Sequence, residues 1–251
     1  MLVENKFIFI NLPRCASNSF LLTCIKNQIN LKFYEDAVTK KLKLLYKEEF
    51  YKYANLEHIG MYRINNHTPL NILHYKFGET HPIIAIRRDR YKRFISFYNY
   101  ILSKLIETKE NEVFEKLKVL TPKDVIFYKK DDISSQENLE KLADDFFNKM
   151  GINNKFKNLY HRDQLKDMFK TFFAPVSHFT HYRPDIIWFD IEKLYMLEDW
   201  VSEKLGKKFV LLKENVSNYK SSFFQINDEF IYYYDSVYNE YDNVKNKKSL
   251  I

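Results

Sequence analysis

A short buried strand that leads through a polar loop into a helix constrains this chain more than any other feature. Residues 7–12 form an almost continuous apolar run with aromatic and β-branched side chains, which is typical of a strand buried on both faces. Pro13 ends the run, and a second apolar run at 20–25 can continue as a helix. Because the first turn of a helix leaves backbone N–H groups unpaired, this order predicts an anion-binding loop at 14–19.

The side chains of this loop suit an anion. Arg14 adds a permanent positive charge, and the serine hydroxyls add hydrogen-bonding groups. The candidate binding residues are Arg14, Cys15, Ala16, Ser17, Asn18 and Ser19. The phosphate loop of nucleotide triphosphatases requires the pattern G-x-x-x-x-G-K-[ST], and this loop contains no glycine. The sequence therefore excludes that particular phosphate loop.

Length and charge set the size of the domain and the sign of its ligand. The 251 residues suffice for one large α/β domain or two small ones. We find no internal repeat, low-complexity tract or clear linker, so a single domain over 1–251 is expected. The net charge of +7, from 40 basic and 33 acidic residues, favours an anionic ligand. A nucleotide, an acidic glycan, nucleic acid and a membrane surface all satisfy that charge.

The cysteines and the hydropathy pattern indicate a cytoplasmic protein. Cys15 and Cys24 are too few for a disulfide framework, and they lack the spacing of a metal site. The N-terminus has no charged region followed by a long apolar segment and a cleavage site. No run approaches the length of about 18 apolar residues that a membrane span needs. We expect reduced thiols, no metal and no membrane span.

A second anion site is predicted where another strand ends. The apolar run at 82–86 leads into the basic segment 87–98. Arg88, at the end of the strand, can bind a phosphate through two parallel hydrogen bonds. Ser96, eight residues later on the following helix, adds a hydroxyl to the same group. Two anion sites at one edge of a sheet suit a nucleotide with phosphates at both ends.

His67 lies in an exposed position before a predicted helix. It stands just before Thr68 and Pro69, which are predicted to open a helix that Gly78 closes. A neutral imidazole can accept a proton near pH 7, so His67 is a candidate for acid–base chemistry. A nearby helix N-terminus would lower its pKa and favour the neutral form. The alternatives of the same residue type are His58, His74 and His81.

Both anion motifs resemble those of sulfotransferases, the enzymes that use 3′-phosphoadenosine 5′-phosphosulfate (PAPS). The loop resembles the family's 5′-phosphosulfate loop, roughly P-K-x-[GA]-[ST]-T-[SW], with Arg14 in place of Lys and Asn18 in place of Thr. The segment after the second strand resembles the 3′-phosphate signature R-[DN]-P-x-[DE]-R-x-x-S-x-Y. The matching residues are Arg88, Asp89, Arg93, Ser96 and Tyr98. Arg90 and Lys92 depart from the usual proline and acid.

The resemblance continues into the C-terminal part of the chain. A late strand at 185–190 is followed by the step Ile191–Leu194 into a helix ending at Gly206, and a last helix covers about 228–244. The turn at 214–218 is similar to the family's N-x-S turn. The resemblance implies a single α/β domain with a central parallel sheet flanked by helices, the P-loop-like sulfotransferase fold. An acceptor-side helical insertion is expected at about 101–170, and residues 30–55 are expected to form an amphipathic helix.

The family's activity is transfer of a sulfuryl group from PAPS to a hydroxyl or amine. The resemblance implies that residues 14–19 together with Arg88 and Ser96 bind the donor. Arg14 would stabilise developing charge, and His67 would take the acceptor's proton. The donor arrives activated, so no metal is required. The histidine and 3′-phosphate patterns are more similar to the carbohydrate branch, which makes a carbohydrate the first choice of acceptor.

Two other classes of function stay open. A P-loop-like nucleotide kinase or phosphohydrolase is disfavoured by the missing Gly-Lys-[Ser/Thr] and by the lack of an obvious magnesium-binding carboxylate after a strand. A nonenzymatic protein that binds nucleic acid or an anionic glycan would account for the net charge of +7. Nucleic acid is disfavoured because the basic cluster at 87–93 is local.

Overall fold

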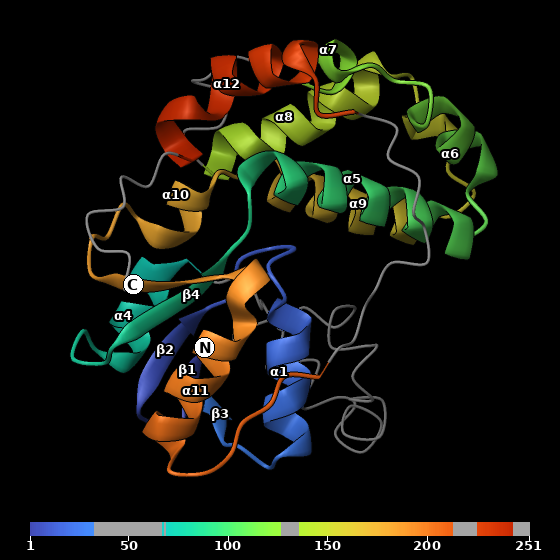
Figure 1. Ribbon diagram of the computed structural model, residues 1–251. Coiled ribbons are helices and arrows are strands. Elements are labelled where there is room, and N and C mark those ends of the chain that lie inside the picture. Colours follow the sequence, from blue (N-terminus) through green and yellow to red (C-terminus); the bar gives the residue numbers. More distant parts are fainter. Residues whose placement is uncertain (33–66, 68, 127–135, 213–224, 243–251) are drawn as a thin grey trace. The chain divides into compact units, whose positions relative to one another are not determined.

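A computed structural model describes residues 1–32, 67, 69–126, 136–212 and 225–242 (Figure 1). The described residues fall into two compact units. The first draws its residues from Met1–Arg87 and Phe179–Asn215, and the second from Arg88–His178 and Val216–Lys245. The chain passes from the first unit to the second directly after a strand, and it returns within the short helix α10 (Val176–Thr180).

The first unit is built on a mixed five-stranded sheet. Its strands in the described residues are β1 (Leu2–Val3), β2 (Phe7–Ile10), β3 (Leu31–Lys32), β4 (Ile83–Arg87) and β5 (Ile186–Asp190). Their order across the sheet is β3-β1-β2-β4-β5. β2, β4 and β5 are parallel, with Ile10 opposite Ala85 and Ala85 opposite Trp188. The carboxyl ends of these three strands therefore meet at one edge of the sheet.

The prediction of a parallel sheet is confirmed for these three strands and wrong for β1, which is reversed. β1 runs antiparallel to both β2 and β3. Glu4 and Asn5, with φ of 47° and 53°, form a tight turn that the hydrogen bond from Lys6 N to Val3 O closes at 2.8 Å. Such a turn can join only antiparallel strands, because a parallel connection needs a crossover of a dozen or more residues.

Both faces of the central strands are buried, as the apolar runs predict. All four residues of β2 are fully buried, and residues 83–86 of β4 are at most 2% exposed. Phe9 stacks on Phe20 of helix α1 (Ser17–Lys26) at a ring distance of 4.0 Å. Phe7 meets Trp200 of helix α11 (Leu194–Leu205) edge-on at 5.1 Å. Because Phe7 and Phe9 project from the same face of the strand, α1 and α11 cover one face of this sheet (Figure 1).

The other predicted elements of the first unit are confirmed with small shifts. Helix α4 runs from Leu70 to Phe77, and Gly78 ends it with φ of 83°. The late strand β5 continues through a 3₁₀ turn, Ile191–Lys193, into α11 (Leu194–Leu205). Gly206 caps α11 in the left-handed conformation that glycine adopts without strain.

The second unit is helical throughout its described residues, as predicted for 101–170. Its elements are α5 (Arg90–Glu107), α6 (Asn111–Leu117), α7 (Pro122–Val125), α8 (Gln136–Lys149), a 3₁₀ turn at Asn153–Lys155, α9 (Leu159–Phe173) and α12 (Asp228–Asp242). Phe146 and Phe147 of α8 pack on Phe169 of α9 at ring distances of 4.8 and 5.1 Å. Phe94 of α5 meets Tyr234 of α12 at 5.5 Å.

Several predictions fall outside the described residues. These are most of the amphipathic helix at 30–55, of which Leu31–Lys32 is instead strand β3, and the turn at 214–218. Cys15 and Cys24 are buried free thiols, which confirms that they do not form a disulfide. Among the described residues, none of the helices combines the length and apolarity that crossing a membrane requires.

Candidate active site

The anion loop follows β2 and is closed by hydrogen bonds to its own start. The Leu12 carbonyl accepts from Ser17 Oγ at 2.9 Å and from the Cys15 N–H at 3.3 Å. Ser17, Ser19 and Cys15 are buried, whereas Asn18 is exposed. The Ser17 hydroxyl therefore donates its hydrogen bond within the loop. Because an anion can only accept hydrogen bonds, Ser17 would contribute its backbone N–H.

Two non-glycine residues of this loop have left-handed backbone conformations. Arg14 has φ of 63°, and Ala16 has φ of 53° and ψ of 18°. A left-handed conformation costs a residue other than glycine roughly 1–2 kcal/mol. Left-handed residues within a turn direct backbone N–H groups toward one side and create a concavity that suits an anion. The loop is not the only place with such residues among the described ones, since Glu4 and Asn5 also have positive φ.

The helix after the loop begins at Ser17, with Ala16 as its N-cap. Alanine has no side-chain oxygen, so the N-cap residue makes no side-chain hydrogen bond to α1. The first backbone bond of the helix runs from Phe20 N to Ala16 O at 3.0 Å. The N–H groups of residues 17–19 precede that bond, so the loop presents a helix N-terminus together with the Arg14 charge.

His67 is brought to the head of this loop. Its Nδ1 lies 2.7 Å from the backbone carbonyl oxygen of Asn11, the residue directly after β2, although 56 residues separate the two in sequence. A carbonyl oxygen can only accept, so Nδ1 is the donor. In the neutral ring the lone pair then belongs to Nε2, which is the arrangement a general base requires. The ring also meets Phe179 edge-on at 6.4 Å.

The helix that follows His67 begins one residue later than predicted. Pro69 is the N-cap of α4 rather than its first residue, with ψ of 151°, while Thr68 lies outside the described residues. Among the alternative bases, His58 also lies outside them. His74 is buried on α4 with its Nδ1 3.9 Å from Glu79 Oε1, so its environment is that of a core residue.

His74 predicts a pH dependence of stability. Burial lowers the pKa of His74, and the charge of Arg183 lowers that pKa further. Because the folded pKa lies below the unfolded value of about 6.5, the folded state resists protonation. The contribution of neutral His74 to the free energy of unfolding is fully present above a pH of about 6.5. It is lost as the pH falls through the folded pKa.

Urea unfolding at about pH 7.5 and 5.5 tests this expectation. His74→Gln should reduce the loss of unfolding free energy between the two pH values, since the titrating group is gone. His81→Gln, in the loop before β4, is the control and should lose as much as the wild type. Equal losses in all three proteins would contradict the assignment.

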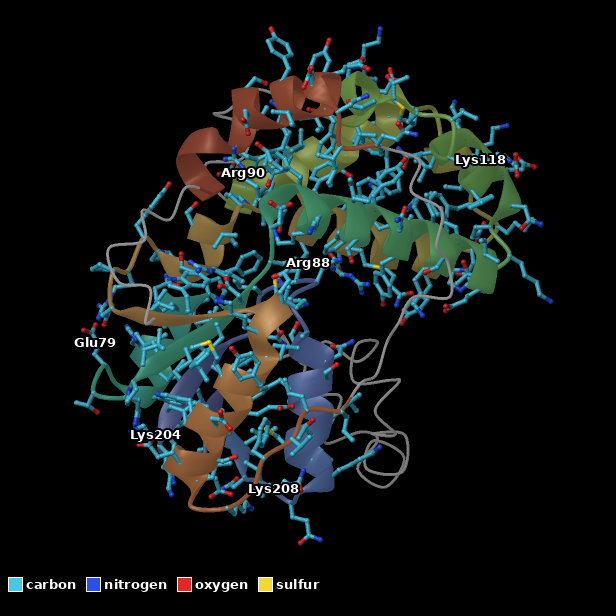
Figure 2. The ribbon with its side chains drawn as sticks, in the orientation of Figure 1. Glu79, Arg88, Arg90, Lys118, Lys204 and Lys208 are labelled. Carbon is cyan, nitrogen blue, oxygen red and sulfur yellow. The ribbon has the colours of Figure 1, made fainter. Side chains whose placement is uncertain are left out.

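The second motif begins directly after β4. β4 ends at Arg87, and Arg88 is the next residue, as predicted. Asp89 caps helix α5 by accepting from the Lys92 N–H at 2.9 Å. Ser96 follows two turns into α5, on the face that contains Asp89, because seven residues bring a helix back to the same side. Figure 2 shows Arg88 and Arg90 where the chain enters α5.

Two residues of the 3′-phosphate signature have structural contacts within the second unit. Arg93 is 4% exposed, and its Nη2 donates to the Ala174 carbonyl at 3.2 Å. Tyr98 is fully buried, and its hydroxyl donates to the Leu117 carbonyl at 2.7 Å. These contacts account for an arginine and a tyrosine at fixed spacing in α5. Arg88 and Ser96 are the two signature residues that the sequence predicts to bind the 3′-phosphate.

Tyr98→Phe should lower stability without affecting a phosphate site. The change removes the hydrogen bond from the Tyr98 hydroxyl, which costs about 0.5–1.5 kcal/mol, while the Leu117 carbonyl still accepts from the Leu120 N–H at 3.2 Å. Denaturant unfolding measures that loss. Tyr75→Phe, at a position that is 91% exposed, is the control and should be neutral. A Tyr98→Phe protein of wild-type stability would contradict the structural role.

The basic cluster at 87–93 is largely compensated by acidic and carbonyl groups. Arg87 of β4 pairs with Asp190 of β5, and these hydrogen bonds hold the pKa of the Asp190 carboxyl below its usual range. Arg90 Nη2 lies 2.8 Å from Asp235 Oδ1 of α12, and Tyr91 bridges the same pair. The cluster therefore does not present five uncompensated cations as a nucleic-acid surface would.

The comparisons with known proteins found no family model, no curated protein and no solved structure that significantly matches this chain.

The anion loop and His67 belong to the first unit, and Arg88 and Ser96 to the second. Within the described residues, no group of three or more His, Cys, Asp or Glu side chains could hold a metal ion. Sequence analysis overlooked Asn11, which could have been noticed as the one polar residue in the run 7–12.

Proposed function

We propose that this chain is a sulfotransferase that moves a sulfuryl group from PAPS to a hydroxyl or amine, with a carbohydrate as the first choice of acceptor. The observation that carries the proposal is the hydrogen bond from His67 Nδ1 to the Asn11 carbonyl. It joins the candidate base to the head of the candidate anion loop, and both lie within one unit. A cytoplasmic location belongs to the same proposal.

The donor supplies an activated sulfuryl group whose sulfur is open to attack. The loop residues fit an oxyanion, because Arg14 and Ala16 have left-handed backbone conformations and the loop leads into the N-terminus of α1. Arg14 would balance charge that develops on the oxygen linking sulfur to the 5′-phosphate. An arginine side chain cannot release a proton, so Arg14 would act through its charge and not as a general acid. Arg88 and Ser96 would bind the 3′-phosphate.

His67 would take the proton of the acceptor. As the acceptor oxygen or nitrogen forms its bond to sulfur, the bond from sulfur to the bridging phosphate oxygen breaks, and adenosine 3′,5′-bisphosphate leaves. The acceptor's proton passes to His67 Nε2, while Nδ1–H stays on the Asn11 carbonyl. That carbonyl keeps the ring in the productive tautomer and stabilises the imidazolium that forms.

Calorimetric titration of the purified protein with adenosine 3′,5′-bisphosphate tests the donor site. ATP and AMP serve as controls, and each titration is run at two salt concentrations. We expect binding selective for the bisphosphate. Equal binding of ATP would favour the nucleotide kinase or phosphohydrolase. Binding to nucleic acid that falls steeply with salt, without bisphosphate selectivity, would favour the basic binder.

A further inference from the structure

The side chain of Asn11 is buried and has no hydrogen-bond partner within the part of the chain that the structure describes. Asn11 is 2% exposed, and neither Oδ1 nor Nδ2 has a partner among those residues. A buried polar group left unpaired costs about 1–3 kcal/mol, so folded proteins rarely retain one without a reason. An amide with both ends unpaired is a prepared donor and a prepared acceptor. A ligand that accepts at one atom and donates at another would satisfy it.

Asn11 joins the end of β2 to the anion loop. It is the residue directly after the strand, where the hydrogen bond from Leu12 N to Ile10 O closes a three-residue turn at 3.1 Å. The Leu12 carbonyl in turn accepts from Ser17 Oγ and the Cys15 N–H of the anion loop. The Asn11 carbonyl accepts from His67.

From this geometry we infer that Asn11 is a binding residue for the group being transferred and for the atom that attacks it. Its Nδ2–H donates to a sulfuryl oxygen, and its Oδ1 accepts from the acceptor's hydroxyl or amine before His67 takes that proton. A sulfuryl group can only accept hydrogen bonds, whereas the hydroxyl or amine that attacks it can also donate one. The amide, with one donor and one acceptor, therefore matches the reacting pair better than it matches the sulfuryl group or the attacking group alone. The inference rests on the proposed sulfotransferase function.

Leucine at this position separates a binding role from a purely structural one. Leu has nearly the shape of Asn and needs no hydrogen bonds, so Asn11→Leu should leave the thermal midpoint of the ligand-free protein equal or higher. The His67 contact is made to the main chain and is kept. Asn11→Asp keeps the shape and the acceptor oxygen but replaces the donor by a charge that repels sulfate. Asn27→Leu, on an exposed residue just beyond the other end of α1, is the control.

The first measurement is the rise in thermal midpoint that inorganic sulfate produces in each protein. We expect sulfate to stabilise the wild type and Asn27→Leu, and to have little effect on Asn11→Leu and Asn11→Asp. If Asn11→Leu fails to fold, Asn11→Asp decides the outcome. A wild type that sulfate does not stabilise would overturn the inference, as would variants at Asn11 with the wild-type response.

The second measurement is transfer from PAPS, together with affinity for adenosine 3′,5′-bisphosphate. Asn11→Leu should lower kcat roughly 10–100-fold, as expected for the loss of one or two hydrogen bonds, and should change bisphosphate affinity less than about threefold. Wild-type turnover in that variant would overturn the inference. Failure of the proposed function gives a different result: the wild type shows no selectivity for the bisphosphate, while its response to sulfate still depends on Asn11.

Discussion

Alanine at His67 should lower kcat for sulfuryl transfer by about 10²–10⁴-fold, the usual contribution of a general base. Affinity for adenosine 3′,5′-bisphosphate should stay within about twofold, because proton transfer is needed only in the transition state. The hydrogen bond from His67 Nδ1 to the main-chain carbonyl of Asn11 orients the ring through the backbone. Single-turnover sulfation and calorimetry measure the two quantities separately.

The pH profile adds a second readout for His67. In the wild type, kcat/KM should fall at low pH with one ionisation as the base becomes protonated, and His67→Ala should lose that limb. His81→Ala removes a histidine before β4 and should retain both the rate and the profile. Unimpaired sulfation by His67→Ala, with wild-type bisphosphate affinity, would eliminate the base assignment.

Alanine at Arg88 should weaken binding of adenosine 3′,5′-bisphosphate by about 100-fold and leave the fold intact. A guanidinium that binds phosphate through charge-assisted hydrogen bonds contributes about 1.5–3 kcal/mol, or roughly 10–150-fold in affinity. Arg88 precedes the cap of α5 and belongs to neither the strand nor the helix, so its removal should spare both elements. Calorimetry measures the affinity, and thermal unfolding tests the fold.

Lys92→Ala is the matched control for Arg88→Ala. It removes the same charge from an exposed position in the first turn of α5, so it reports the loss of net charge alone. We expect it to weaken bisphosphate binding only slightly, and less at higher salt. Equal losses in the two variants would mean that the basic cluster acts as a diffuse field. That result would remove Arg88 from the list of specific binding residues.

Local patterns in the sequence predicted the elements that position the site. The apolar runs at 7–12 and 82–86 became the buried strands β2 and β4, and glycine ended α4 and α11 as predicted. These features depend on side-chain spacing and on the conformational needs of a few residues, which neighbouring residues reveal. The hairpin of β1 and β2 was missed because a strand of two residues has too little periodicity to detect.

The roles of particular side chains depended on contacts between distant segments. The spacing of Arg93 and Tyr98 matched a phosphate signature, yet their side chains bind the backbone at Ala174 and Leu117. Hydrogen bonding across 56 residues placed His67 at the end of β2, and burial left the Asn11 amide without partners. The sequence by itself determined the strand–loop–helix order and the residue types at its ends. Only the tertiary structure decided which polar groups the fold satisfies, because burial and partners come from packing and not from local spacing.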